Sequence, residues 1–306
     1  MKVLTEQDLP LKEETVCTIG SFDGFHIGHI HLLEKTKEEA KRTGRKSLVI
    51  TFEPHPKKIL SPQNAPCRIT DLTTKLELLR YQKIDYVYVI HFTKEYAKKP
   101  AEEFLDFLTE NLRCKKIIVG HDWRFGYGGK GCVEFASEYG KKAGFEVEVI
   151  PPIKIDRTRI SSTEIRKLLK EGRVDEAEKY LGRTYCIKGK VIKGDRLGQK
   201  IGFPTINIIP DVDLCLKKGV YMGYVSFDHK LYPAVINYGT RPTVDGKKTF
   251  IEAHIIGEKL EKDIKEVKIF FKRFIREEKK FNNIQELQNQ IKNDIQKAIN
   301  ALEVKT

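Results

Sequence analysis

The first half of the chain alternates apolar runs of strand length with stretches whose apolar residues recur every three or four positions. In residues 29–41, for example, Leu32, Leu33 and Ala40 fall on one helical face. The same pattern predicts strands at residues 16–21, 47–52, 86–90, 117–119 and 145–150, and further helices at residues 71–82 and 101–111. Because strands and helices alternate, we expect a doubly wound, Rossmann-like α/β fold with a parallel sheet, whose ligands bind beyond the carboxyl ends of the strands.

From about residue 183 the pattern changes to short segments rich in β-branched and aromatic residues. Six such segments are separated by Gly, Pro and Asp turns, at residues 185–191, 204–209, 219–227, 231–238, 249–256 and 265–271. This spacing predicts a small antiparallel β-barrel. A C-terminal helix is predicted to follow, because Asn283 and Glu286 form a capping pair before apolar residues that share one helical face. We therefore expect two domains, at residues 1–182 and 183–306.

Composition fits two globular domains. The chain has 306 residues, of which 40% are hydrophobic and 32% charged, and this composition excludes wholesale disorder. No apolar run approaches the roughly 18 residues of a membrane span, and residues 1–10 lack the apolar core of a secretory signal. We expect a cytoplasmic protein that does not associate with membranes.

The charge balance favours partners that carry phosphate. Lysine and arginine number 56 against 43 acidic residues, which gives a net charge of +13. Nucleic acids and nucleotides both suit this charge, but the basic residues are interleaved with acidic ones rather than gathered into a track. We expect nucleotide binding and no nucleic-acid partner, and the sequence leaves the oligomeric state open.

The cysteines indicate no metal or redox motif. The six lie far apart, with no pair at C-x-x-C spacing. We expect most of them to be buried, reduced side chains.

The segment at residues 20–29 follows a predicted strand and opens a predicted helix. Backbone N–H groups and the helix dipole attract phosphate at such a position. Gly28 lets a phosphate approach the backbone, while His26 and His29 can donate hydrogen bonds to charge that develops as a phosphoanhydride breaks. A single histidine here would more often be a cap or a core residue, but two in H-x-G-H favour a site. The candidate residues for binding a nucleotide phosphate here are Gly20, Phe22, Asp23, Gly24 and Gly28.

A second phosphate site is predicted at residues 160–166. Ser161 and Glu164 have the spacing of a capping box, so a plain helix start is one interpretation. Arg166 favours more than that, because a cation in the first turn opposes the helix dipole unless an anion is bound nearby. Ser162 and Thr163 would supply hydroxyl donors to the same anion.

The glycine-rich loop at residues 123–131 carries aromatic and basic side chains. Rings and cations on such a loop suit a flat aromatic ligand with a phosphate tail. A surface turn with incidental aromatic residues fits the loop alone equally well. The candidate ligand-binding residues are Asp122, Trp123, Arg124 and Phe125.

The loop that joins the first two barrel strands is also rich in glycine. Its backbone N–H groups can wrap phosphates, and the candidates are Gly194, Gly198 and Gly202. Thr205 and Asn207 follow on one face of a strand, because side chains alternate with period two. Their oxygens can ligate Mg²⁺ beside a nucleotide, although a hairpin with outward polar residues explains the same pattern.

These motifs together resemble a known family. Residues 26–29 (H-I-G-H) and 160–163 (I-S-S-T) resemble the nucleotidylyltransferase superfamily, and with residues 52–56 and 119–126 they resemble the first domain of bacterial bifunctional riboflavin kinase/FAD synthetase. The second domain resembles the riboflavin kinase domain of that family in four further segments, at residues 204–207, 219–221, 237–243 and 251–254. The resemblance implies that the second domain phosphorylates riboflavin with ATP to FMN. It implies that the first domain adenylylates FMN with ATP to FAD and pyrophosphate.

The resemblance also implies residue roles. Glu252 becomes the general base toward the riboflavin 5′-hydroxyl, a role that suits a carboxylate ionised at neutral pH. Arg276 resembles a flavin-side arginine, although a solvated charge run explains it nearly as well. His26, His29 and Arg166 would stabilise charge during adenylyl transfer, and Mg²⁺ would accompany ATP.

The sequence departs from the family pattern at three places. Trp123 stands where the family usually has Phe, Gln199 where it usually has Arg, and Gly257 with Glu258 where Asp-Phe is common.

Two other functions fit parts of the sequence. A class I aminoacyl-tRNA synthetase would share H-I-G-H, but the partner motif K-M-S-K-S is absent from the sequence. A flavin- or RNA-binding regulator would bind ligands without turnover, and the presence of Glu252, Thr205, His26 and His29 argues against it.

Overall fold

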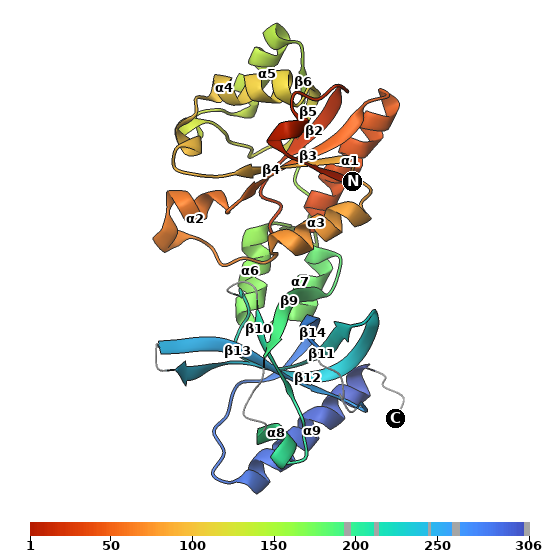
Figure 1. Ribbon diagram of the computed structural model, residues 1–306, viewed down its shortest axis with the longest axis vertical. Helices are drawn as coiled ribbons and strands as arrows, with labels where there is room; N and C mark the ends of the chain where they lie inside the picture. The colour runs from red at the N-terminus through yellow and green to blue at the C-terminus, as the bar shows by residue number, and fades with distance from the viewer. Residues whose placement is uncertain (193–196, 211–213, 244–245, 259–263, 303–306) are drawn as a thin grey trace. The chain divides into compact units, whose positions relative to one another are not determined.

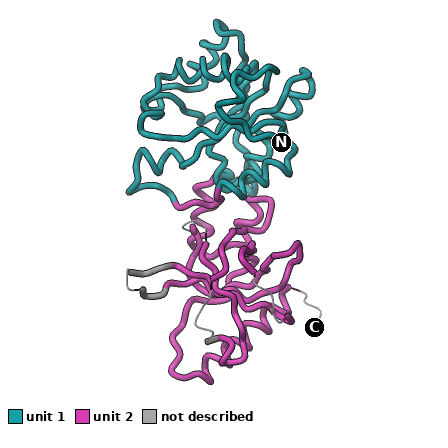
Figure 2. Tube along the Cα trace, viewed as in Figure 1, with its two compact units in different colours: residues 1–66, 72–161 teal, residues 67–71, 162–306 magenta. Residues whose placement is uncertain are grey.

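The computed structural model describes residues 1–192, 197–210, 214–243, 246–258 and 264–302. The predicted phosphate-loop residue Gly194 lies outside these ranges. The chain forms two compact units (Figure 2): unit 1 comprises residues 1–66 and 72–161, and unit 2 comprises residues 67–71 and 162–306.

Unit 1 contains a six-stranded parallel sheet in the order β1-β4-β3-β2-β5-β6 (Figure 1). The strands are β1 (Lys2–Leu4), β2 (Thr15–Ile19), β3 (Lys46–Glu53), β4 (Tyr86–His91), β5 (Cys114–Gly120) and β6 (Glu146–Ile150). The longer helices are α1 (Ile27–Arg42), α3 (Leu72–Tyr81), α4 (Ala101–Asp106), which continues as a π-helical turn (Phe107–Asn111), and α5 (Val133–Ala143). The predicted α/β fold is therefore confirmed.

Helices cover both faces of this sheet, as expected where parallel strands are buried on two sides. On one face, Leu48 and Ile117 pack with α4 and α5 residues such as Phe104. On the other, Val49 and Val87 pack with residues of α1 and α3. From β2, the chain adds β3 and β4 on one side of the sheet and then β5 and β6 on the other. The carboxyl ends of β2 and β5 therefore flank the topological switch point, where ligands bind in open α/β sheets.

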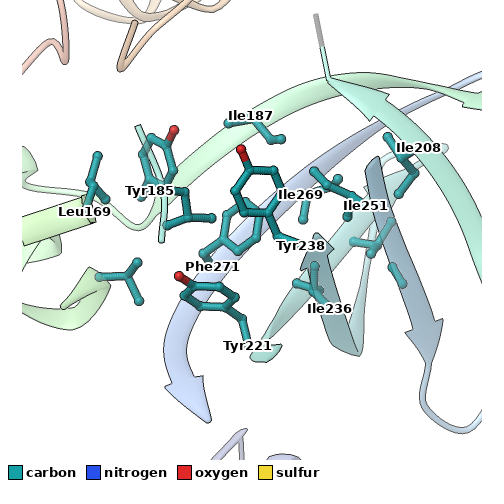
Figure 3. Close-up of a cluster of buried hydrophobic side chains, with 14 of the residues drawn as sticks. Leu169, Tyr185, Ile187, Ile208, Tyr221, Ile236, Tyr238, Ile251, Ile269 and Phe271 are labelled. Atoms are coloured by element: carbon teal, nitrogen blue, oxygen red, sulfur yellow. The ribbon is translucent and has the colours of Figure 1, made fainter. Parts of the chain in front are cut away.

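Unit 2 is built on a closed antiparallel barrel in the order β10-β13-β12-β11-β14-β9, with β9 pairing back to β10. The strands are β9 (Tyr185–Ile192), β10 (Ile206–Pro210), β11 (Gly219–Phe227), β12 (Lys230–Thr243), β13 (Gly246–Ile255) and β14 (Glu266–Arg276). All six match predicted strands, so the barrel prediction is confirmed. Tyr185, Tyr221 and Phe271 fill its interior among branched aliphatic side chains (Figure 3).

Three helices pack on this barrel. Residues 162–182, which the sequence pattern placed in the first domain, form α6 (Ser162–Glu171) and α7 (Val174–Leu181), and their apolar residues join the barrel core. The predicted C-terminal helix is α9 (Ile284–Leu302). Its residue Ala298 packs with Val220 and Val235 on the outer face of β11 and β12.

Short elements complete the described chain. They are α2 (Pro56–Leu60), the two-stranded pair β7 (Lys154–Ile155) and β8 (Thr158–Arg159), α8 (Leu197–Lys200), and 3-10 turns at Glu6–Asp8, Pro62–Asn64, Tyr96–Lys98 and Tyr127–Gly129. None of the described helices is long and apolar enough to cross a membrane.

The cysteines differ from the expectation. Neighbouring strands bring Cys17 and Cys114 together, and the structure joins them in a disulfide. A second disulfide joins Cys67 to Cys215 within unit 2. The expectation of reduced side chains is therefore wrong for these four residues. It missed pairs that are 97 and 148 residues apart in sequence, because only the fold makes them neighbours.

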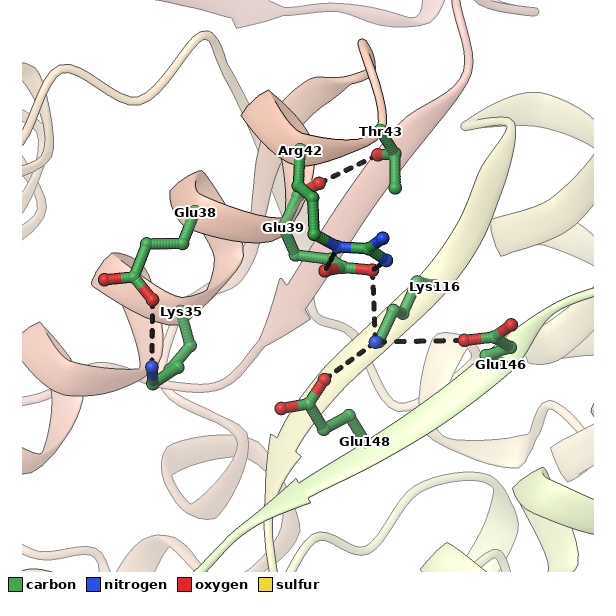
Figure 4. A network of polar contacts seen from close by, with 8 residues as sticks. All are labelled: Lys35, Glu38, Glu39, Arg42, Thr43, Lys116, Glu146 and Glu148. Carbon is green, nitrogen blue, oxygen red and sulfur yellow. Dashed lines mark hydrogen bonds and ion pairs between the residues drawn. The ribbon is translucent and has the colours of Figure 1, made fainter.

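An ion-pair network links α1 to β5 and β6 of unit 1 (Figure 4). The Lys116 ammonium lies 3.1 Å from a Glu39 carboxylate oxygen and 2.8 Å from one of Glu148. Arg42 binds both oxygens of Glu39 at 2.7 Å. These hydrogen bonds from Arg42, aided by Lys116, outweigh the effect of partial burial and lower the pKa of Glu39 to about 2.

Glu39→Gln is expected to lower the melting temperature by about 2–4 °C at pH 7. Because the carboxyl pKa is lowered in the folded state, its stabilising contribution is present above the ordinary carboxyl pKa and is lost as the pH falls from about 4.5 to about 2. Melting curves of both proteins at pH 7, 4 and 3 should therefore converge. Glu38→Gln, which removes an exposed pair with Lys35, serves as the control and should change little. A difference that stays constant with pH would contradict this account.

Candidate active sites

The turn after β2 has an unusual backbone. Phe22 and Phe25 adopt positive φ angles of 48° and 44°, on either side of Gly24 at 87°. Bulky residues seldom adopt this left-handed conformation. Here both rings are 1% exposed and pack in the core under α1 and α3, which holds the strained turn in place. The Phe22 ring, predicted to bind nucleotide, is therefore a core group that also packs edge-on against the His29 ring, with centroids 5.2 Å apart.

His26 and His29 cap each other at the start of α1. The His29 backbone N–H donates to Nδ1 of His26, and the His26 backbone N–H donates to Nδ1 of His29, both at 3.3 Å. The rings stack with their centroids 3.6 Å apart. The predicted role of a histidine as a helix cap is therefore filled by both residues, which form a reciprocal capping box.

This capping determines the tautomer of both rings. Each Nδ1 accepts a hydrogen bond, so in the neutral imidazole the proton lies on Nε2. Both rings can therefore donate through Nε2 to an anion. The arrangement supplies two parallel donors at a helix N-terminus beside the switch point, which is a suitable place for phosphate.

Gly28 is required for the stacking. A Cβ at this position would lie 3.1 Å from Cε1 and 3.2 Å from Nδ1 of His26. A side chain at position 28 would therefore push the His26 ring a few tenths of an ångström out of its stacked position.

Gly28→Ala is expected to slow FAD formation from FMN about tenfold or more, since small displacements of positioned groups are costly in catalysis. The melting temperature should change little, because the preference of a helix for alanine over glycine, about 1 kcal/mol, opposes a loss of similar size when the His26 cap is displaced. Rates of FAD formation and melting curves test both parts. FMN formation from riboflavin is the internal control, and an unchanged adenylylation rate would contradict the prediction.

Lys75 is a residue of this site that the sequence pattern missed. It lies on α3, is 2% exposed, and its ammonium donates to the Ser21 carbonyl at 2.6 Å and to the Thr51 hydroxyl at 3.1 Å. A buried cation thereby connects the turn after β2 to β3. No sequence signal marked it, because a lysine in an amphipathic helix is normally solvated.

The loop after β5 reaches the same switch point. Asp122 pairs with Arg159 at 2.5 Å. Partial burial raises the pKa of Asp122, but the hydrogen bond from Arg159 more than compensates, so that the pKa lies below its ordinary value. Phe125 is 8% exposed and stacks on Trp123 with centroids 4.2 Å apart. Of the predicted flavin-binding residues, Asp122 and Arg124 are exposed and Trp123 half-buried, whereas Phe125 belongs to the core.

The predicted second phosphate segment crosses the boundary between the units. Ser161 ends unit 1, whereas Ser162, Thr163 and Arg166 belong to α6 of unit 2. Arg166 is the fifth residue of this helix, and its Nε donates to the Cys67 carbonyl at 2.9 Å. A common phosphate site with the imidazoles of unit 1 stays a prediction.

The candidate site of unit 2 is a cavity of about 280 Å³ on the outer face of the barrel, under α9. It is lined by Gly198, Ile201, Phe203, Thr205, Asn207, Val220, Val235, Asn237, Glu252, His254, Arg276, Glu278, Lys279, Phe281, Leu287, Ile291 and Asp294. The cavity therefore gathers the predicted residues Gly198, Thr205, Asn207, Glu252 and Arg276. Another predicted residue, Gly202, lies near it with a positive φ of 85°.

Strand pairing fixes the positions of the polar residues in the cavity. Asn207 on β10 lies directly opposite Glu252 on β13. Gly198 lies close under Thr205, since a Cβ there would come within 3.2 Å of the Thr205 hydroxyl and 2.4 Å of the Phe203 carbonyl oxygen. The glycine thus allows the loop before β10 to approach the polar strand.

The sequence pattern did not predict three polar contacts at this cavity. His254 shares a strand face with Glu252, and its Nδ1 lies 2.8 Å from the Pro204 carbonyl oxygen, next to Thr205. Asp294 on α9 is 1% exposed and pairs with Arg276 at 2.9 Å. Gln290 donates to the other Asp294 oxygen at 2.9 Å. The C-terminal helix therefore orients the predicted flavin-side arginine.

Family models match both parts of the chain. The FAD synthetase family model matches residues 8–164, and the riboflavin kinase model matches residues 181–302. The bifunctional riboflavin kinase/FMN adenylyltransferase of Escherichia coli (strain K12) is 35% identical over 285 residues, which cover 92% of this chain and 91% of that protein. The Haemophilus influenzae protein of the same name is 34% identical over 283 residues, covering 92% of each. The chain belongs to the bifunctional riboflavin kinase/FMN adenylyltransferase family.

Membership in the bifunctional riboflavin kinase/FMN adenylyltransferase family confirms the predicted family and the two predicted activities. A solved structure titled as a macrolide-efflux protein from Streptococcus pneumoniae also matches, with a TM-score of 0.85 and 28% identity over 96% of this chain and 97% of that one. Its title describes efflux, a word that does not occur in the names of the two relatives. The assignment as an aminoacyl-tRNA synthetase finds no support in these matches.

Proposed function

We propose that the cavity of unit 2 transfers the γ-phosphoryl group of ATP to riboflavin, with Glu252 as general base. The supporting observation is the placement of Glu252 opposite Asn207 in a cavity that also contains Thr205 and Arg276. Glu252 accepts the proton of the riboflavin 5′-hydroxyl as its oxygen bonds to the γ-phosphorus. The bond from that phosphorus to the bridging oxygen breaks, and ADP leaves.

We propose that Thr205 and Asn207 hold Mg²⁺ with the nucleotide. A hydroxyl and an amide oxygen on one strand face are hard ligands of the kind Mg²⁺ takes, with phosphates and water completing the shell. Bound there, the ion would neutralise charge on the transferred group.

Thr205→Val removes one proposed ligand while keeping the side-chain size. The Mg²⁺ concentration needed for half-maximal FMN formation is expected to rise about tenfold or more. The Mg²⁺ dependence of FAD formation from supplied FMN should not change. An unaltered Mg²⁺ dependence of the kinase would remove Thr205 from the metal site.

For the second activity, we propose that the FMN phosphate attacks the α-phosphorus of ATP in line and releases pyrophosphate. His26 and His29 donate from Nε2 to the charge that develops on the phosphate oxygens. Ser162, Thr163 and Arg166 would bind the remaining phosphates, and Trp123 with Arg124 would contact the flavin. No covalent intermediate on the protein is required.

The test is to incubate the full chain with riboflavin, ATP and Mg²⁺ and to separate the flavins by chromatography. FMN should appear first and FAD afterwards, with ADP and pyrophosphate as co-products. Ligand binding without FMN or FAD formation would instead favour the regulator considered above.

We propose ATP, riboflavin and FMN as the partners of this chain and the cytoplasm as its location. The support is that both reactions consume ATP. Fractionation of cells followed by activity assays would test the location.

A further inference from the structure

The residues of the barrel cavity form one row across five strands. Asn207 on β10 faces Glu252 on β13, Glu252 faces Asn237 on β12, Asn237 faces Val220 on β11, and Val220 faces Arg276 on β14. All five line the same cavity. Since neighbouring strands lie about 4.8 Å apart, the backbone of Asn237 is about 5 Å from that of Glu252, and Arg276 lies three strand spacings, about 14 Å along the curved sheet, from Glu252.

Asn237 is the one polar residue of this row to which no role has been assigned. Its side-chain oxygen is shielded from solvent, yet it has no hydrogen-bond partner within the part of the chain that the structure describes. Leaving such an acceptor unsatisfied costs about 1–3 kcal/mol. A group of this kind that lines a cavity is suited to accept a hydrogen bond from a bound ligand.

We propose that Asn237 accepts a hydrogen bond from a secondary hydroxyl of the riboflavin ribityl chain and thereby selects flavins that carry this chain. The inference rests on the proposed kinase function. When the riboflavin 5′-hydroxyl lies at Glu252 on β13, the neighbouring hydroxyls of the ribityl chain lie at the adjacent strand β12, which carries Asn237. Val220 then offers an apolar surface, and Arg276 lies far enough along the row to meet the ring system.

The row also separates Asn237 from the proposed metal site. Asn207 and Asn237 lie on opposite sides of Glu252, so two strand spacings, about 10 Å, separate their backbones. Mg²⁺ holds its ligands at about 2.1 Å. This spacing favours a hydroxyl of the substrate as the partner of Asn237.

The experiment compares Asn237→Val with Asn237→Thr. Both residues are β-branched and of equal size, so they suit a strand alike, but only threonine keeps an acceptor oxygen. Valine is expected to raise the KM for riboflavin about 10- to 100-fold, and threonine much less. The KM for ATP, the Mg²⁺ dependence and FAD formation from supplied FMN should stay unchanged.

Binding of lumiflavin, which has the flavin ring but no ribityl chain, distinguishes recognition from a structural role. Its affinity in the presence of ADP and Mg²⁺ should be equal for the wild-type chain and both variants. The inference is overturned if Asn237→Val weakens the binding of lumiflavin as much as that of riboflavin, or if it shifts the Mg²⁺ dependence of FMN formation. If the Asn237→Val variant does not fold, the test is the affinity of the wild-type protein for flavins that each lack one ribityl hydroxyl. Equal affinity for all of these flavins overturns the inference.

The experiments distinguish an error in the proposed kinase function from an error in the role of Asn237. A wild-type chain that makes no FMN overturns the proposed function itself. A wild-type chain that makes FMN, with a valine variant whose KM for riboflavin is unchanged, overturns only the role of Asn237.

Discussion

Glu252→Gln should lower the rate of FMN formation by about 10²- to 10⁴-fold, the range expected for loss of a general base. Glutamine keeps the size of the side chain and its place opposite Asn207 and Asn237, but it cannot take the proton of the attacking hydroxyl. Conversion of supplied FMN to FAD should continue at the wild-type rate, because that reaction is assigned to the imidazoles of unit 1. Chromatography of the flavins, with riboflavin or FMN as the starting substrate, measures both rates.

Glu278→Gln is the matched control, since Glu278 is a second carboxylate that lines the same cavity. It should retain most of the kinase activity. If Glu252→Gln still forms FMN at a normal rate, the proton acceptor is another group. If it loses both activities while remaining folded, the assignment of two separate sites fails.

His29→Ala should have the opposite selectivity and lower FAD formation from FMN by about 10²- to 10³-fold. The change removes one Nε2 donor, and it also removes the acceptor of the His26 backbone N–H, so the stacked pair loses its alignment. FMN formation from riboflavin should be unaffected. Pyrophosphate release with FMN and ATP as substrates measures the loss.

His31→Ala provides the control for this variant. His31 lies on the same helix, two residues further on, but takes no part in the reciprocal cap. The control should retain full adenylylation. Equal losses in the two variants would indicate damage to α1 rather than removal of a catalytic donor.

Sequence periodicity predicted the helices and strands correctly where the segments are long or strongly patterned. All six barrel strands and the five longer strands of the sheet were predicted. The three-residue strand β1 is too short to show a period. Helix α5 was missed because its buried face is formed by small residues, Ala136 and Gly140, in place of large apolar ones. Helices α6 and α7 were assigned by chain order, but their apolar faces belong to the barrel core.

The sites were predicted where the chemistry is local in sequence, as in H-I-G-H and P-T-x-N. Aromatic side chains in glycine-rich loops were harder to interpret, because a ligand contact and a core anchor have the same sequence pattern. Phe22 and Phe125 are both anchors in the structure. Lys75, Asn237 and Asp294 could not be singled out, since their importance depends on partners far away in the chain.

The row across the barrel limits how this enzyme can change. Its polar members alternate with Ala253 and Ile236, which point inward. Inserting or deleting one residue within β12 or β13, without a β-bulge to absorb the change, would turn the working side chains beyond that point into the hydrophobic interior and expel apolar ones. Evolution of the kinase should therefore vary the lengths of its connecting turns and preserve the lengths of these strands.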